Sequence, residues 1–186
     1  MSDVAVRVND LGRDYPVGGR TVRALRGVSF TVCRGELVAV RGRSGAGKTT
    51  LLNLVGGLDR PTTGRIEVAG HDITAATEDE LLALRRDTIG FVFQSFGLIP
   101  LLSAAENVGV PMRLARRPAA ERDKRVAVLL EMVGLGAHAA QRPYELSGGQ
   151  QQRVAVARAL ANPRTWSAVA AVGLVVGLVG FAFLEP

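Results

Sequence analysis

The 186-residue sequence contains a single cysteine, Cys33, which excludes an internal disulfide. This fits a reducing compartment such as the cytoplasm. Cys33 ends the apolar run 28–32, which favours a small packing residue at a strand end over a reactive thiol. The first residues have no basic stretch followed by an apolar core, so we expect no secretory signal.

Lysine is almost as rare. Lys48 and Lys124 are the only two, so arginine supplies 21 of the 23 basic residues behind the net charge of +6. The arginines are scattered, and a short cluster such as residues 122–125 alternates with acidic residues, as on a solvated helix face. Together with the abundance of Ala, Gly and Val, this indicates a biased coding composition. We therefore expect no nucleic-acid partner.

Acidic residues are missing from the end of the sequence. Beyond Pro163 the only carboxylate is Glu185, and the 19 residues 166–184 carry no charge. As a helix this run would be about 28 Å long, against a hydrocarbon core of about 30 Å. The run therefore suggests possible direct membrane contact by residues 166–184.

What is present is a complete phosphate-binding pattern. An apolar run, residues 36–40, leads into a glycine-rich turn and then a predicted helix, residues 48–55, in the order typical of a P-loop. The turn points backbone N–H groups at a polyphosphate, and the helix directs its positive dipole end at the anion. We expect Lys48 to reach the β- and γ-phosphates and the Thr49 hydroxyl to ligate Mg²⁺. The predicted loop residues are Gly42, Arg43, Ser44, Gly45, Ala46, Gly47, Lys48, Thr49 and Thr50.

The remaining pattern alternates strands and helices. Strands are predicted at residues 4–8 (an edge strand), 28–32, 36–41, 65–69 and 88–93, with a turn-rich segment at 9–20. Thr77 with Glu80 forms a capping box that starts another helix. From about residue 103 to 142 the periodicity becomes helical, and a last helix runs from Ser147 to about residue 161.

Two short motifs complete the pattern. Gln94 follows a predicted strand, and the sequence Leu146, Ser147, Gly148, Gly149, Gln150 opens the last helix. Alone, each would be a surface amide or a glycine-rich N-cap. In this order with the P-loop, they resemble the nucleotide-binding domain of ABC transporters, over residues 4–163. Details such as residues 51–53, 57–59, 90–94 and 106–108 look most like the lipoprotein-release and macrolide-export type.

The resemblance implies an α/β fold, with a P-loop NTPase sheet, an N-terminal antiparallel β layer and a helical subdomain near residues 103–142. It implies that Tyr15 stacks on the adenine of ATP and that Gln94 touches Mg²⁺ and the attacking water. Residues 146–150 would contact ATP held by a second nucleotide-binding domain in a head-to-tail dimer. The implied function is the ATP-binding subunit of a transporter, coupling ATP hydrolysis to export or lipoprotein release through membrane-spanning subunits at the cytoplasmic face of the membrane.

The resemblance stops at Pro163. The family continues with an apolar strand ending in Asp-Glu, the Walker B strand, whose acids hold Mg²⁺ and polarise water. Here those acids are absent, so we expect slow or absent hydrolysis. Three interpretations of the apolar tail 164–186 stay open: a membrane anchor, a substitute strand over residues 168–176, or a truncated or frame-shifted end. An alternative function is a catalytically inactive nucleotide-binding or regulatory module.

Overall fold

The computed structural model describes residues 4–161 and 171–174 of the chain. The chain divides into two units, each described here by itself. The first comprises residues 1–88 with 167–178, and the second comprises residues 89–166 with 179–186. The phosphate-loop sequence lies in the first unit and the 146–150 sequence in the second.

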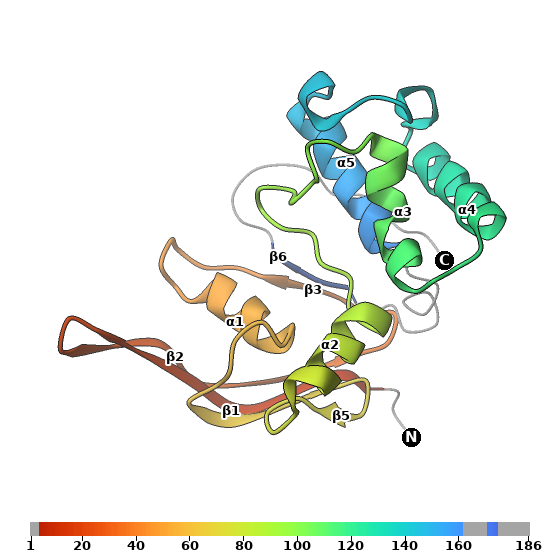
Figure 1. Cartoon of the computed structure of the whole chain (residues 1–186). Coiled ribbons are helices and arrows are strands. Elements are labelled where there is room, and N and C mark those ends of the chain that lie inside the picture. The colour runs from red at the N-terminus through yellow and green to blue at the C-terminus, as the bar shows by residue number, and fades with distance from the viewer. Residues whose placement is uncertain (1–3, 162–170, 175–186) are drawn as a thin grey trace. The chain divides into compact units, whose positions relative to one another are not determined.

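The first unit contains the expected antiparallel β layer. Its strands are β1 (Val4–Val17), β2 (Arg20–Cys33), β4 (Thr63–Val68) and β5 (His71–Asp72), in the order β2-β1-β4-β5. Every neighbouring pair is antiparallel, and β1 and β2 form the long hairpin at the red end of the chain in Figure 1. Val8, Leu11 and Ile66 on these strands are almost fully buried, so the sheet presents one face to the core.

The edge-strand prediction for residues 4–8 was wrong, since β1 lies between β2 and β4. The turn-rich segment at residues 9–20 is also mostly strand. The turn is confined to Gly18 and Gly19, and β1 absorbs its irregular residues as register shifts between Val8 and Asp14. Asp10 takes a left-handed φ of 46° at one of these shifts. Bulges of this kind keep a strand paired across residues that would otherwise break it.

A second, parallel pair carries the phosphate loop. β3 (Leu37–Val40) pairs with β6 (Ala171–Leu174), with Leu37 opposite Ala171 and Val40 opposite Leu174. Figure 1 shows the two strands side by side. This pairing accords with the substitute-strand interpretation over these four residues. The rest of the predicted tail, including the proposed membrane-contacting run 166–184 outside residues 171–174, lies outside the described residues.

The first helix of the first unit has the bounds that the sequence predicts, and the second helix begins where the sequence predicts. α1 (Lys48–Val55) follows the phosphate loop and ends at Gly56. α2 (Glu78–Asp87) begins at the predicted capping box, in which Glu80 N–H donates to the Thr77 hydroxyl at 3.3 Å and Thr77 N–H donates to Glu80 at 2.7 Å. Both boundaries depend on residues adjacent in sequence, which is why local rules located them.

The second unit is helical. It consists of α3 (Ala104–Leu114), α4 (Ala119–Met132), the 3₁₀ turns η1 (Gly136–His138) and η2 (Pro143–Glu145), and α5 (Gly148–Ala159). Its core contains Val108, Leu129 and Val154, one from each α-helix. Buried Asn107 joins α3 to the preceding loop: its side-chain amide donates to the carbonyls of Ile99 and Leu102, and its oxygen accepts from Ile99 N–H.

The strand predicted at residues 88–93 was wrong. After α2 ends at Asp87 the segment is a turn and an irregular loop, and none of the described strands pairs with it. An apolar sequence makes a strand only where a neighbouring strand accepts its hydrogen bonds. In the described part of the chain, no helix combines the length and apolar character needed to cross a bilayer.

Candidate functional site

The phosphate loop is shaped by its glycines. Gly47 caps α1 in the left-handed region at φ 82°, and Gly45 lies at φ 78°. A Cβ on Gly47 would collide with the backbone carbonyl oxygen of Ala24 and lie 2.8 Å from the Leu25 side chain. A larger residue at Gly47 would therefore push the loop away from β2. The sequence predicts that this loop needs glycine. At Gly47 this holds for two independent reasons, the left-handed φ and the lack of space for a Cβ.

The N-terminus of α1 is left open. The N–H groups of Lys48, Thr49 and Thr50 lie in the first turn, where helix geometry gives them no intrahelical partner. Within the described residues no side chain caps this end, and the first turn contains no acidic residue. Uncompensated N–H groups and a positive dipole end are what an anion requires. The geometry therefore fits a polyphosphate.

Lys48 is held across the loop. Its ammonium group donates to the carbonyl oxygens of Gly42 and Arg43, each at 2.8 Å. Ala46 N–H closes the turn onto Arg43 C=O at 3.2 Å. The side chain is thus directed back over the loop instead of into solvent. Breaking two hydrogen bonds to neutral carbonyls in favour of a phosphate is favourable, because charged pairs bond more strongly than charge–neutral ones.

Tyr15 lies on β1 of the same unit. Its hydroxyl donates to a carboxylate oxygen of Asp59 at 2.6 Å, and the guanidinium of Arg13 lies 4.3 Å from the ring centroid. Arg13, two residues before Tyr15, pairs across the β1–β2 ladder with Leu25, whose side chain approaches Gly47. Tyr15 and the phosphate loop therefore belong to the same unit and are linked through β2.

The 146–150 sequence opens α5 through a capping box. Gln150 N–H donates to the Ser147 hydroxyl at 3.3 Å, and Ser147 N–H donates to the Gln150 amide oxygen at 2.8 Å. Leu146 is buried, whereas nothing lies within 4 Å of where a Cβ on Gly148 or Gly149 would be. The N–H groups of Gly148 and Gly149 are left for a ligand, since the cap occupies that of Gln150.

A family model described as ABC transporter matches residues 25–166. The chain belongs to the ABC transporter ATP-binding family. It is 52% identical over 153 residues to an uncharacterised ABC transporter ATP-binding protein of Thermotoga maritima, covering 82% of this chain and 65% of that protein. It is 49% identical over 162 residues to a macrolide export ATP-binding/permease protein MacB of Hyphomonas neptunium, covering 87% of this chain but 25% of that protein.

Solved structures of ABC cassettes have the same fold. The dimeric post-hydrolysis state of the ATP-binding cassette MJ0796, bound to ADP and Pi, matches with a TM-score of 0.79 and 45% identity. The match covers 84% of this chain and 69% of that one. The α/β fold expected from the resemblance is confirmed. The chain spans 65% of the Thermotoga protein and a quarter of the MacB protein, so it represents a part of such sequences.

The other residues predicted for this ABC cassette lie in the second unit. Gln94 is exposed in the turn that follows the irregular segment 89–93. The turn is tied to α5, because the guanidinium of Arg158 donates to the carbonyl oxygens of Phe96 at 2.8 Å and Gly97 at 2.6 Å. Burial lowers the pKa of Arg158 from its ordinary value. Thr49 and Gln94, the predicted Mg²⁺ ligands, belong to different units of the chain.

Sequence reasoning missed the residues that support these motifs. Both ring nitrogens of His138 form hydrogen bonds. Nδ1 lies 2.8 Å from the Gln141 amide oxygen, and Nε2 lies 3.4 Å from the Gln150 amide nitrogen. If the Gln141 oxygen accepts, Nδ1 carries the proton and Nε2 accepts from Gln150. Gln151 donates to the carbonyl oxygens of Pro143 and Leu146. The available signal was the run of three glutamines at residues 150–152, which local rules interpret only as helix surface.

Proposed function

We propose that this chain binds Mg-ATP through the 42–50 loop and Tyr15, as the ATP-binding part of a membrane exporter. The observation that carries the proposal is the open N-terminus of α1, with Gly47 against β2 and Lys48 folded over the loop. Gly42, Arg43, Ser44, Gly45, Ala46 and Thr50 complete the cradle. The MJ0796 cassette bound to ADP and Pi supports nucleotide as the ligand.

Magnesium would be held mainly by the nucleotide. The described residues contain no cluster of three His, Cys, Asp or Glu side chains suited to a metal ion. Mg²⁺ commonly keeps several waters and binds through substrate phosphates with one or two protein ligands. Thr49 would supply its hydroxyl and Gln94 its amide oxygen. The ion would neutralise charge on the β- and γ-phosphates.

A second copy, or a second cassette, would complete the site. Ser147, Gly148 and Gly149 would contact the γ-phosphate held by the partner, with Leu146 and Gln150 setting the helix start. The dimeric MJ0796 structures support this arrangement. The name of the MacB relative, which joins ATP-binding to permease, supports membrane-spanning partner subunits and a place at the cytoplasmic face of the membrane.

Hydrolysis by this chain alone would be slow. β6 runs parallel to β3, and the residues that follow it in sequence supply no carboxylate until Glu185. Without a carboxylate to orient water, phosphoryl transfer loses a principal catalytic group. The alternative function, an inactive or regulatory nucleotide-binding module, would likewise bind nucleotide without rapid turnover.

The test is binding and turnover measured on the same preparation. A fluorescent ATP analogue should bind saturably, compete with ATP, and bind more tightly with Mg²⁺ than with EDTA. Steady-state phosphate release should be close to the no-protein rate. Absence of saturable binding would refute the nucleotide site. Rapid phosphate release would refute the slow-turnover part and would point to another acid.

A further inference from the structure

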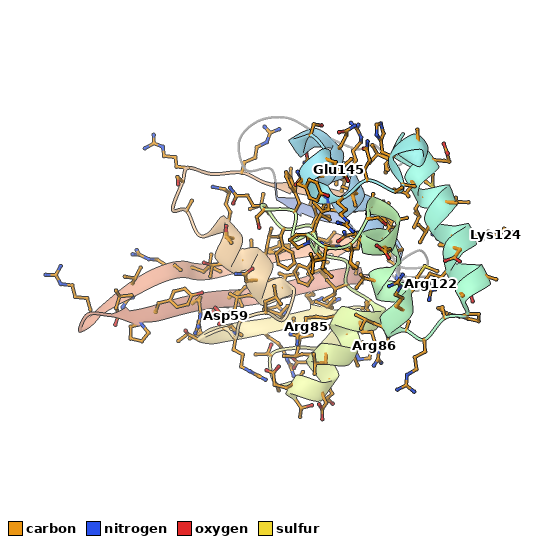
Figure 2. All side chains as sticks on the ribbon, turned by 45° about the horizontal axis from the view of Figure 1, so that its top comes forward. Asp59, Arg85, Arg86, Arg122, Lys124 and Glu145 are labelled. Carbon is orange, nitrogen blue, oxygen red and sulfur yellow. The ribbon has the colours of Figure 1, made fainter. Side chains whose placement is uncertain are left out.

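A polar cluster in the first unit surrounds the Tyr15 ring. Arg13 donates to both carboxylate oxygens of Asp59, from Nη2 at 2.7 Å and from Nε at 3.0 Å. Tyr15 Oη donates to the same carboxylate at 2.6 Å. Asp59, labelled in Figure 2, belongs to the chain that leaves α1, whereas Arg13 and Tyr15 belong to β1. The cluster therefore joins residues more than 40 positions apart.

The cluster constrains the ring in two directions. The carboxylate holds the hydroxyl end, and the Arg13 guanidinium covers one face at 4.3 Å from the centroid. The side chains of Arg13 and Asp59 are each 23% exposed, so solvent competes only partly for these bonds. A planar ligand would stack on the opposite face of the ring. A ring held in advance loses less conformational freedom when a ligand stacks on it.

The charges of the cluster persist at neutral pH. Burial raises the pKa of Asp59, but hydrogen bonds from Tyr15, from Arg60 N–H and from Arg13 outweigh it and bring the pKa below its ordinary value. The pKa of Arg13 is raised, first through its interaction with Tyr15. Asp59 thus stays a carboxylate that accepts the hydrogen bond from the Tyr15 hydroxyl, and Arg13 stays a cation. A bidentate pair of this kind is geometrically stiff.

The cluster is also linked to the phosphate loop through β2. Arg13 pairs with Leu25 in the β1–β2 ladder, and the Leu25 side chain approaches Gly47, the N-cap of α1. The loop that contains Asp59 is joined to β1 again, since Thr62 N–H donates to Gly12 C=O at 2.9 Å and Asp14 N–H donates to the Thr62 hydroxyl at 3.0 Å. A ligand with its phosphates at α1 would extend toward this ring.

We propose that Asp59 and Arg13 are positioning residues that hold the Tyr15 ring for a purine base and so determine the preference for nucleotides over base-free polyphosphates. The inference rests on the proposed nucleotide function. It assigns the pair a role in affinity for the base, whereas the phosphate loop supplies affinity for the phosphates. A pair that only braced β1 against the chain after α1 would change stability and leave this preference unaltered.

The test compares two ligands, ATP and inorganic tripolyphosphate, by calorimetric titration in the presence of Mg²⁺. Asp59→Asn removes the charge of the carboxylate but keeps its shape. Tyr15→Phe removes only the hydroxyl, so this second variant tests the same hydrogen bond with less risk to folding. Each should weaken ATP binding about fivefold to tenfold, less than the loss of a charged hydrogen bond made directly to the ligand, because the pair acts through the Tyr15 ring. Binding of tripolyphosphate should stay within about twofold, since it has no base to stack.

The chain offers a matched control. Arg65 and Asp72 form another arginine–carboxylate pair in the same sheet, at 2.6 Å, between β4 and β5. Asp72→Asn should leave the affinity for both ligands unchanged. Equal losses for ATP and tripolyphosphate in Asp59→Asn and Tyr15→Phe, or no loss for either, would overturn the inference. If the unmutated chain binds neither ligand, the proposed function itself fails and the inference with it.

Discussion

Helices α1 and α5 both begin at glycine-rich sequence, but their N-termini are built in opposite ways. α1 starts at a left-handed glycine with no side-chain cap among the described residues, and its first-turn N–H groups are open. α5 starts at Ser147, and a reciprocal pair of hydrogen bonds with Gln150 satisfies its N3 donor. α1 thus depends on a ligand to compensate its N-terminus. The N-terminus of α5 is partly satisfied by its own capping box and leaves only the N–H groups of two glycines.

The largest expected effect is a loss of nucleotide affinity, and it is tested by substituting the two lysines in turn. Lys48→Ala removes the cation folded over the α1 loop and should weaken binding of a fluorescent ATP analogue about 10-fold to 100-fold, the range for a charged hydrogen bond. Lys124→Ala, on exposed α4 in the second unit and labelled in Figure 2, is the matched control. Equal losses in both variants would mean that net charge, not the loop, sets the affinity.

Glycine-to-alanine changes at the two helix starts should have different effects on the free energy of unfolding. Gly47→Ala meets a left-handed φ and a collision with Ala24, so it should lower the free energy of unfolding by more than about 2 kcal/mol. Gly149→Ala enters open space inside a helix and should leave it unchanged or raise it by up to about 1 kcal/mol. Urea unfolding measures both. Similar destabilisation by the two changes would contradict the comparison.

The cap of α5 is the next largest effect. Ser147→Ala removes the acceptor of Gln150 N–H and should cost about 1 kcal/mol of unfolding free energy. Ser44→Ala, at an exposed position in the phosphate loop, is the matched serine change and should stay within about 0.5 kcal/mol. The readout is again urea unfolding, supplemented by hydrogen exchange at the first turn of α5. A larger loss for Ser44→Ala would show that the phosphate loop is capped after all.

The smallest effect concerns pH. Glu80 and Glu106 complete the capping boxes of α2 and α3, and hydrogen bonds from the N–H groups of Thr77 and Ser103 lower their pKa values. The stability they add is present above their unfolded pKa and is lost as pH falls through the lowered folded value. Gln150, their counterpart in α5, does not titrate.

Hydrogen exchange between neutral and acid pH should therefore show the first turns of α2 and α3 losing protection while α5 keeps its own. Glu80→Gln is the control, since it should remove the pH dependence from α2 alone. Loss of protection at α5 over the same range would show that its first turn depends on a titrating group outside the capping box.

Short-range features were predicted well. The bounds of α1, the capping box at Thr77 and the start of α5 at Ser147 all depend on residues within four positions of one another. The capping box at Ser103 and Glu106 follows the same rule and was overlooked. The strand at residues 88–93 failed because apolar composition does not specify a pairing partner.

The sequence by itself determined the phosphate loop, the 146–150 helix start and the family, because glycines, caps and one lysine act through neighbouring backbone groups. Tertiary structure decided the central position of β1, the pairing of β6 with β3, and the cluster of Arg13, Tyr15 and Asp59. These depend on residues brought together from distant positions, and hydrogen bonds between them exist only once the chain has folded.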